Sequence, residues 1–253
     1  MADEVLVERQ GRILVATINR PDSRNAVNHA VSQGLANAVD ELDSDANLSV
    51  AVITGAGGNF CAGMDLKAFA AGERIDVPGR GLGFTERPPR KPIISAVEGY
   101  ALAGGTEVVL ATDLVVASRT AKFGIPEVKR GLVAAGGGLL RLPRRIPFQK
   151  ALELALTGDS FTAEQAEAWG FVNVLTEPGE ALAAAIALAE RITANGPMAV
   201  AVTKQIRVQG GNWNDREMWS KQLELVIPVF TSNDAKEGSI AFAEQRAPSW
   251  TGT

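Results

Sequence analysis

The stretch that decides the fold is residues 92–138, PIISAVEGYALAGGTEVVLATDLVVASRTAKFGIPEVKRGLVAAGGG. Two apolar runs in it, 92–97 and 114–118, are short, partly β-branched and bounded by proline, glycine or charged residues, which is typical of buried strands. Between them lie Gly104 and Gly105, where the backbone can turn sharply and another group can approach it closely. The stretch therefore predicts strand, short helix and strand, with the helix beginning near Gly104.

Two carboxylates stand out in this stretch. Glu107 falls in the first turn of the predicted helix, and Glu127 follows Pro126 in a predicted turn, 20 residues further on. Both have apolar neighbours in the chain, where a charge is costly unless it is used or paired. Two interpretations stay open at this point. The pair performs acid–base chemistry, or Glu107 pairs with an arginine while Glu127 caps a helix.

Composition places the chain among ordinary globular proteins. It has 253 residues, 46% of them hydrophobic and 21% charged, which fits one large domain or a domain with an appendage. The net charge of −4 and the lack of a basic patch argue against nucleic acid as a partner. No apolar run approaches the roughly 18 residues of a membrane span, and the acidic start lacks a secretory signal. With Cys61 as the lone cysteine, we expect a cytoplasmic protein.

Cysteine and histidine offer little chemistry. Cys61 and His29 are the single residues of their types, so a zinc site of the Cys/His kind is excluded and no metal is expected. A Ser-His-Asp or Cys-His nucleophile would have to use His29, and nothing else in the chain indicates one. We expect Cys61 to be a small residue in a turn and His29 to lie exposed at a helix start.

The N-terminal third predicts a hairpin, a helix and a strand. The hairpin is predicted over 5–9 and 12–19, the helix over 28–42, and the buried strand over 48–54. The glycines at 55–58 that follow lack the endings of a phosphate loop or a dinucleotide fingerprint, so we predict a tight turn.

In the segment that follows the glycines, Gly63 permits an unusual backbone angle, and Asp65 is predicted to cap the next helix. Residues 72–91 are rich in Gly, Pro and Arg without periodicity, and we predict a flap beside the active site.

The C-terminal part changes character near residue 175. A strand over 171–175 and a helix over 178–194 are predicted, and after them only helices. This divides the chain into a core, 1–195, and a helical region, 196–253, that serves oligomerisation. The helical region has apolar faces that must be buried against the body or against a neighbouring subunit. Those positions are Met218, Leu223, Leu225, Val226, Val229 and Phe230.

Taken together, these motifs resemble the crotonase superfamily and, within it, the enoyl-CoA hydratases. No single piece is specific, but their order along the whole chain is. The matching pieces are Ile18-Asn19-Arg20-Pro21 with Arg24-Asn25-Ala26, Phe60-Cys61-Ala62-Gly63-Met64-Asp65, Gly99 through Glu107, Phe123-Gly124-Ile125-Pro126-Glu127, Leu156-Thr157-Gly158, and Asp234 through Glu244.

The resemblance implies an α/β fold, a spiral of ββα units followed by an all-helical trimerisation region. It implies a homotrimer, or a homohexamer made of two trimers. The implied substrate is an acyl group thioesterified to coenzyme A, and the implied reaction is reversible syn addition of water to a 2-enoyl-CoA to give a 3-hydroxyacyl-CoA. Coenzyme A is then part of the substrate, and no separate cofactor is implied.

Site residues carry over from the resemblance by position. The thioester oxygen is expected to accept hydrogen bonds from the backbone N–H groups of Met64 and Gly104, as backbone donors suit an oxyanion. Glu107 is expected to activate water and Glu127 to deliver a proton to Cα, with the two roles open to sharing. The positions implied to bind substrate or coenzyme A are Ala26, Ala62, Asp65, Lys67 and Phe242.

Other functions remain open. Residues 139–143 and the tail also resemble carnitinyl-CoA dehydratases, which run the same chemistry on a charged acyl chain. An enoyl-CoA isomerase needs only one of the two carboxylates, and a member of a different class would be a non-catalytic oligomer that binds acyl-CoA. Many hydratases also carry a lysine for the coenzyme A phosphate where this chain has Gln245, next to Arg246. Adjacent residues on a helix point about 100° apart, so Arg246 should face elsewhere and we expect weak phosphate binding.

Overall fold

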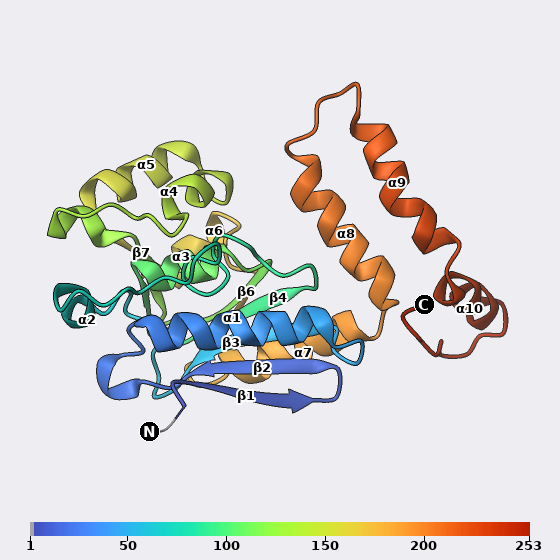
Figure 1. Ribbon diagram of the computed structural model, residues 1–253, viewed down its shortest axis with the longest axis horizontal. Helices are drawn as coiled ribbons and strands as arrows, with labels where there is room; N and C mark the ends of the chain where they lie inside the picture. Colours follow the sequence, from blue (N-terminus) through green and yellow to red (C-terminus); the bar gives the residue numbers. More distant parts are fainter. Residues whose placement is uncertain (1–2) are drawn as a thin grey trace.

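The structure is a computed structural model that describes residues 3–253 (Figure 1). Within these residues the larger sheet has six strands in the order β1-β2-β3-β4-β6-β9, with β1 antiparallel to β2 and all other pairs parallel. The hairpin predicted at the N-terminus is confirmed as β1 and β2. The strands are β1 Val5–Gln10, β2 Ile13–Ile18, β3 Val50–Gly55, β4 Ile93–Val97, β6 Leu114–Ser118 and β9 Val174–Thr176.

Helices cover both faces of this sheet. Alternate residues of one strand point to opposite sides, so Leu14 packs into one apolar cluster and Ile13 into another. Helix α7 (Ala181–Thr193) covers the face of Ile13 with a row of buried alanines. Helices α1 (His29–Ser44) and α3 (Gly104–Leu110) lie on the other face. Helix α3, which carries Glu107, is therefore supported from below by the sheet.

A second, small sheet positions the loops around α3. Its strands are β5 (Tyr100–Leu102), β7 (Lys122–Gly124) and β8 (Ser160–Thr162), in the order β5-β7-β8. Two successive units, β4–β5–α3 and β6–β7, each give one strand to the large sheet and one to the small sheet. The sequence did not predict these strands, because three residues are too few for a period to show.

Caps explain where several helices begin. Asn28 caps α1, and Thr162 with Gln165 forms a capping box at the start of α6 (Ala163–Ala168). Helix α7 begins at Ala181, later than the predicted residue 178. The N–H groups of Ala181, its first residue, and of Gly179, just before it, donate to the Glu98 carboxylate between β4 and β5. This long-range contact is not contained in the local pattern.

Other ends also shift by a few residues. Helix α1 extends to Ser44, and β9 starts at Val174 because Phe171 and Val172 turn into the core. The remaining short elements are α2 Leu66–Ala70, α4 Gly138–Arg141, α5 Phe148–Thr157, and the 3₁₀ helices η1 Pro21–Ser23, η2 Pro126–Arg130 and η3 Leu142–Arg144.

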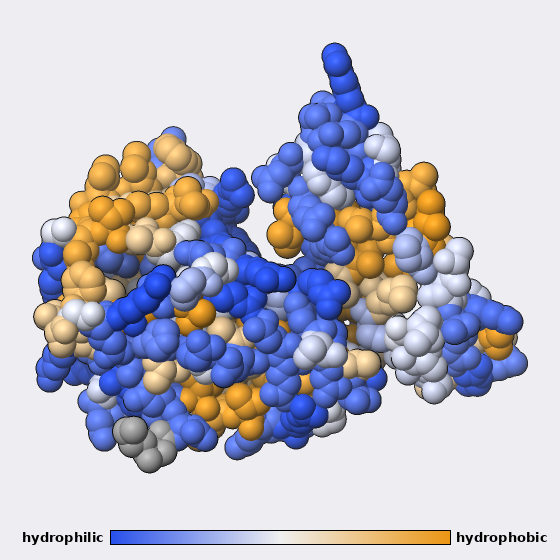
Figure 2. Space-filling view, in the orientation of Figure 1, coloured by the Kyte–Doolittle hydropathy of each residue, from blue (hydrophilic) through white to orange (hydrophobic). Residues whose placement is uncertain are grey.

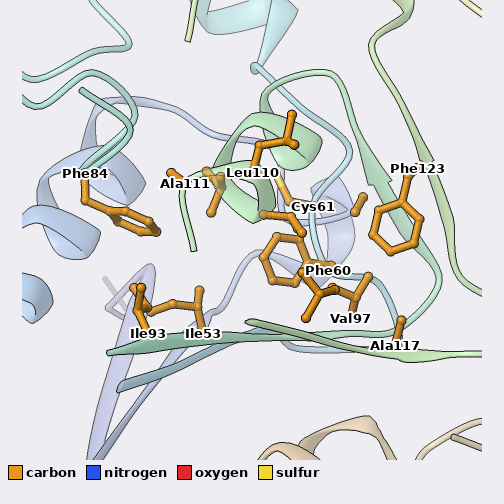
Figure 3. Packing of buried hydrophobic residues seen from close by; sticks show 14 of the residues in the cluster. Ile53, Phe60, Cys61, Phe84, Ile93, Val97, Leu110, Ala111, Ala117 and Phe123 are labelled. Carbon is orange, nitrogen blue, oxygen red and sulfur yellow. The ribbon is translucent and has the colours of Figure 1, made fainter. Parts of the chain in front are cut away.

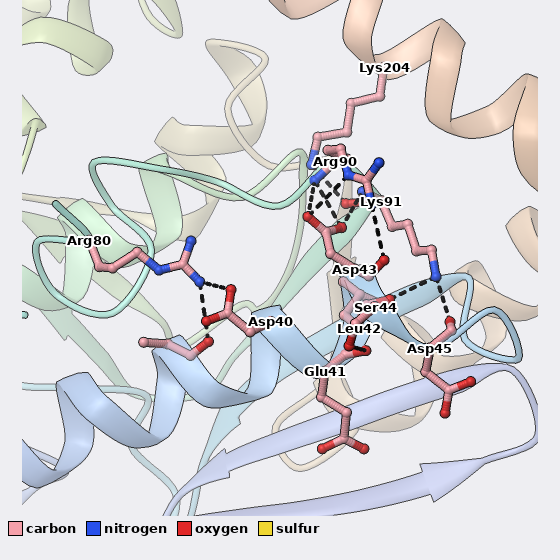
Figure 4. A network of polar contacts seen from close by, with 11 residues as sticks. Asp40, Glu41, Leu42, Asp43, Ser44, Asp45, Arg80, Arg90, Lys91 and Lys204 are labelled. Atoms are coloured by element: carbon pink, nitrogen blue, oxygen red, sulfur yellow. Dashed lines mark hydrogen bonds and ion pairs between the residues drawn. The ribbon is translucent and has the colours of Figure 1, made fainter.

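The flap, residues 72–91, has no helix or named strand but is pinned to the body. Phe84 is buried in the main core (Figure 3). Arg80 pairs with Asp40 on α1, and the Arg90 backbone N–H donates to Asp43 at 2.9 Å (Figure 4). Acidic side chains on α1 therefore hold the flap at these two positions.

The C-terminal helices form an arm. Helices α8 (Pro197–Gly210) and α9 (Met218–Phe230) pack on each other and extend away from the sheets, followed by α10 (Asn233–Ala243) (Figure 1). Lys204 ties α8 to the body through Asp113, at 2.7 Å. No residue of α8 or α9 is buried in the described chain. No helix within residues 3–253 is long and apolar enough to cross a membrane.

One face of α9 stays uncovered. Leu223 is 56% and Phe230 77% exposed, although their pattern predicts burial. Together with Trp219 and Ile227, which are also exposed, they form one face of α9, here called the α9 stripe. Of the two ways to bury the arm, contact with the body therefore does not account for this face.

Candidate active site

The loop that leads into α2 is shaped by Gly63. The φ of Gly63 is 103°, a backbone angle that glycine adopts readily and other residues rarely do. A Cβ there would lie 2.6 Å from the Cβ of Ala103. Asp65 then caps α2, as predicted, by accepting from the N–H groups of Lys67 and Ala68. Its other oxygen accepts from Arg20 at 3.0 Å. The loop is thus held from both sides, which fixes the position of residue 64.

Two backbone donors lie side by side in this region. The Val27 N–H donates to the Gly63 carbonyl, and the Asp65 N–H donates to the Val27 carbonyl. The Met64 N–H between them has no acceptor within residues 3–253. Gly104 is the first residue of α3, where an N–H has no partner inside the helix. A Cβ added to Gly104 would lie 3.6 Å from the Met64 nitrogen. Both N–H groups can therefore donate to the same ligand oxygen.

Glu107 is held in a cradle of glycine backbone. Its side chain is 4% exposed, and the Gly138 N–H donates to its Oε1 at 2.9 Å. A Cβ on Gly136 would lie 2.6 Å from Oε2, so the loop approaches the carboxylate as closely as glycine allows. Burial raises the pKa of Glu107, while the N–H groups of Gly138 and Gly136 and the Arg141 charge oppose that rise. The cradle favours the ionised form of an otherwise buried acid.

Glu127 has a different environment. It lies in η2, and its Oε2 is buried without a hydrogen-bond partner within residues 3–253. Burial and, to a lesser extent, the nearby Glu107 charge together raise the pKa of Glu127 to about 7. A carboxyl with this pKa exchanges a proton readily near neutral pH. Burial thus raises the pKa of both carboxyl groups, and the opposing glycine N–H groups are found at Glu107 and not at Glu127.

An apolar cavity adjoins Glu127. Its volume is about 380 Å³, which is within the size range of small-molecule pockets. Glu127 is the single ionisable side chain among its lining residues, and the others come mainly from the segment 125–156. The cavity can accept an apolar chain whose reacting end lies beside Glu127.

Residues 8–253 match the family described as enoyl-CoA hydratase/isomerase. This chain belongs to that family. The enoyl-CoA hydratase EchA19 of Mycobacterium tuberculosis is 43% identical and is matched over 98% of this chain and 96% of its own length. A carnitinyl-CoA dehydratase of Salmonella arizonae is 40% identical over the full length of both chains. The crystal structure of an enoyl-CoA hydratase from Mycobacterium tuberculosis has a TM-score of 0.98 and 68% identity, covering 99% of this chain and 100% of that one.

These matches confirm the predicted α/β fold of the crotonase superfamily. The structure brings together four of the family positions named from the sequence, namely the N–H groups of Met64 and Gly104 and the carboxylates of Glu107 and Glu127. Glu107 accepts a hydrogen bond from glycine backbone and not from an arginine side chain, which argues against the alternative in which it pairs with an arginine.

The other expected binding residues are spread over two regions. Ala26, Ala62 and Lys67 lie near the loop that holds Met64, with Lys67 exposed on α2. Asp65 uses both oxygens inside the protein, so its charge is already paired with Arg20. Phe242 is 87% exposed on α10, far from α3 (Figure 1). Within one chain, Phe242 does not reach the site.

Gln245 and Arg246 lie beyond the end of α10, contrary to the expectation that they are neighbours on a helix. Helix α10 ends at Ala243, and Gln245 has a φ of 54°, so the angle between neighbours on a helix does not apply. Arg246 is instead held by Glu237 and Glu244, at 2.7 Å each. This pairing holds the pKa of Glu237 down at about 2. Arg246 is therefore engaged, although for a reason other than helix geometry.

The sequence did not reveal two features of the site. The first is the cradle that the glycines at 136–138 form around Glu107. The sharp turn before α3 falls on Ala103, with φ 51° and ψ −126°, and not on a glycine. The glycine triplet is a signal of the cradle that can be seen in the sequence. No residue pattern around Ala103 indicates the unusual backbone angles there.

Cys61 and His29 agree with their structural interpretation. Cys61 is buried and burial raises the pKa of its thiol to about 12, so it is not a reactive thiolate. His29 is exposed at the start of α1. No group of three or more metal-ligating side chains occurs within residues 3–253.

Proposed function

We propose that this protein is an enoyl-CoA hydratase, which adds water reversibly and with syn geometry to a 2-enoyl-CoA thioester to give a 3-hydroxyacyl-CoA. The observation that carries the proposal is the pair of neighbouring buried carboxyl groups, Glu107 and Glu127. Burial raises the pKa of both, and glycine N–H groups oppose this rise at Glu107 alone. Adding water across a double bond needs a base for the water and an acid for Cα, and a pair of this kind supplies both.

The Met64 and Gly104 N–H groups would hold the thioester oxygen. As water attacks Cβ, negative charge moves onto that oxygen, and two fixed donors stabilise the resulting enolate. Both N–H groups lack an acceptor within residues 3–253 and lie near each other. Because the donors are backbone groups, the side chain of residue 64 has little to contribute, whereas residue 104 must leave room for the thioester.

The surroundings of the two acids support a division of labour. Backbone donors stabilise the Glu107 anion, so Glu107 is the better candidate to take a proton from water. Glu127 has an unpartnered oxygen and a pKa of about 7, so it holds a proton that it can deliver to Cα. Since the two groups interact, their apparent pKa values belong to the pair.

The apolar cavity beside Glu127 supports an aliphatic acyl chain. Its lining residues other than Glu127 carry no charge. The coenzyme A part of the bound substrate would then extend out of the site past Ala26, Ala62, Asp65 and Lys67. Asp65 would act through its backbone or through the shape of the loop, because its side chain is already bonded within the protein. No separate cofactor enters this mechanism.

Assembly as a homotrimer, or as a homohexamer of two trimers, completes the proposal. The arm, residues 196–253, would serve as the oligomerisation region and the core, 1–195, as the unit that holds the site. Exposed apolar residues occur on the α9 stripe and over α4 and α5, where Figure 2 shows hydrophobic surface at the upper left. Such patches are typical of interaction surfaces. A neighbouring subunit would bring Phe242 to a coenzyme A site. Cytoplasmic location remains a prediction from composition.

A second function has one specific observation in its favour, the full-length similarity to a carnitinyl-CoA dehydratase. That chemistry also uses both carboxylates, so the acyl chain decides between the two. An isomerase would use one carboxylate, and a non-catalytic acyl-CoA binder would use neither.

The test is turnover of crotonyl-CoA, followed by loss of the enoyl absorbance and by mass spectrometry of the product. A hydratase adds the mass of water, an isomerase leaves the mass unchanged, and a pure binder gives no product. Crotonobetainyl-CoA in parallel tests the carnitinyl alternative. A kcat/KM for crotonobetainyl-CoA above that for every uncharged enoyl-CoA of a length series would overturn the assignment to aliphatic chains.

A further inference from the structure

A second cavity lies at the C-terminal end of α3, opposite the end that carries Gly104. It has a volume of about 340 Å³ and lies between α3, the end of the flap, the segment 141–145 and helix α8. The catalytic carboxylates and the Met64 loop do not line it. Its ionisable lining residues are Arg90, Asp113, Arg141, Arg144, Arg145 and Lys204. Five cations therefore surround a single carboxylate.

The one carboxylate in the cavity is already paired. Asp113 lies 2.7 Å from the Lys204 ammonium, and its Oδ2 also accepts from the Ile93 N–H. Arg90 has its own partner outside the cavity, Asp43, at 3.7 Å (Figure 4). Three arginines remain without a carboxylate of their own in the cavity lining.

These three arginines bind backbone carbonyl oxygens or nothing. Arg141 donates to the carbonyls of Gly136 and Thr85, and Arg145 to those of Thr112 and Asp113. Arg144 is exposed and has no hydrogen bond or ion pair within residues 3–253.

Charge balance around the arginines is poor. Burial and the neighbouring arginines lower the pKa of Arg141. The charge of Glu107, which lies outside the cavity lining, opposes this shift. Burial also lowers the pKa of Arg145. The Asp113 charge opposes this shift, and Arg207 adds to it. Like charges held together in a partly buried cavity are unfavourable unless an anion compensates them.

We infer that this cavity binds a small polyanion, a molecule that presents several carboxylate or phosphate oxygens to Arg141, Arg144 and Arg145. Guanidinium groups match both oxyanions in planar, two-pronged geometry, and such charge-assisted bonds are stronger than neutral ones. The volume exceeds that of one water-sized ion and fits a compact metabolite. Because α8 supplies Lys204 and the body supplies the arginines, the bound anion also joins the arm to the core.

Isothermal titration calorimetry on the assembled wild-type protein tests this site without any turnover. Inorganic pyrophosphate and citrate are the two probes, at about 0.15 M salt, and they distinguish a phosphate ligand from a carboxylate ligand. We expect at least one of them to bind at one site per chain, and Arg144→Gln to raise its dissociation constant at least tenfold, as loss of a charge-assisted bond predicts.

Two further variants keep the test decisive. Arg119→Gln removes an arginine paired with Glu177 on another surface, so binding should stay within twofold of wild type. Arg145→Gln should weaken binding as Arg144→Gln does, if circular dichroism shows that it folds. The inference fails if neither probe binds below about 10 mM, or if Arg144→Gln binds as tightly as Arg119→Gln. Because no activity is measured, failure here leaves the proposed hydratase function untouched.

Discussion

The core around Glu107 and the C-terminal arm differ in how far their helices are buried. Every residue of α3 is buried, whereas α8 and α9 contain no buried residue in the described chain. The core therefore completes its own packing, and with it the positions of the reacting groups. The arm presents an apolar face that one chain does not cover. Chemistry and assembly are assigned to different regions, so variants in each region should have separable effects.

The largest effect is expected from Gly104→Val in the core. A Cβ at this position would lie 2.9 Å from Leu82 Cδ1 and 3.6 Å from the Met64 nitrogen, so a branched side chain fills the space of the thioester. Hydration should fall below detection while the oligomer stays intact. Met64→Leu keeps the N–H and a similar volume, so it should keep activity within a few fold. Equal losses from the two changes would point to side-chain chemistry at residue 64 and against a backbone oxyanion site.

Next in size are Glu107→Gln and Glu127→Gln. Each removes one proton-transfer group but keeps the shape of the side chain, so kcat should fall roughly 10²–10⁴-fold. Sedimentation and acyl-CoA binding should match wild type, because both residues belong to the core and not to the arm. Near-normal turnover of either variant would show that the paired-carboxylate mechanism does not operate in this protein.

In the arm, Leu223→Asp should have the opposite signature. Burying a leucine contributes about 1.5–3 kcal/mol, so placing a charge there should weaken subunit association by roughly tenfold to a hundredfold or more. Analytical ultracentrifugation measures this loss, and thermal unfolding of the core should change little. Glu224→Gln, at an exposed neighbouring position, is the matched control. Unchanged association of Leu223→Asp would exclude the α9 stripe from the interface.

A smaller effect concerns stability and pH. The pKa of Glu127 is raised to about 7 from 4.5, so the folded protein binds its proton more tightly than the unfolded chain does. The free energy of unfolding should then fall as pH rises from about 4.5 to about 7, because in this range the folded protein keeps a proton that the unfolded chain has already lost. Allowing for solvent screening of this half-buried group, about 1–2 kcal/mol should be lost. Chemical denaturation at pH 5 and pH 8 should show a smaller difference for Glu127→Gln than for wild type.

The smallest effects are expected at the end of the arm. Arg246→Ala should change the affinity for acyl-CoA little, because Glu237 and Glu244 already hold this guanidinium. Gln245→Lys should tighten acyl-CoA binding, and the gain should shrink as salt is raised. A rise of more than tenfold in the dissociation constant of Arg246→Ala, with assembly intact, would identify Arg246 as the phosphate ligand.

Sequence patterns predicted the long elements and the reacting groups but not the contacts between distant segments. The hairpin, α1 and β6 follow from periodicity, and the capping box of α6 from local chemistry. The start of α7 depends on Glu98, which is distant in sequence. The cradle of Glu107 likewise requires residues 136–138 to meet α3. Both are products of tertiary packing, which a local pattern does not contain.

The basic cavity illustrates the same limit. Its arginines were visible in the sequence, but their lack of carboxylate partners appears only when the end of α3, the segment 141–145 and α8 come together. In the same way, the exposed α9 stripe has an ordinary helical pattern, and only the structure shows that the body does not cover it.

The small sheet also has a kinetic consequence. It joins β5, β7 and β8, and isolated bridges add Cys61 to β5 and connect Met64 with Val27. Chain segments from residue 27 to residue 162 must therefore meet before the Met64 and Gly104 donors lie together. Contacts of such long sequence separation form slowly, because the chain loses loop-closure entropy before the contacts stabilise it. We expect the amide of residue 101 to gain hydrogen-exchange protection later in refolding than amides in the β1–β2 hairpin. Equal protection times in a pulse-labelling experiment would contradict this order.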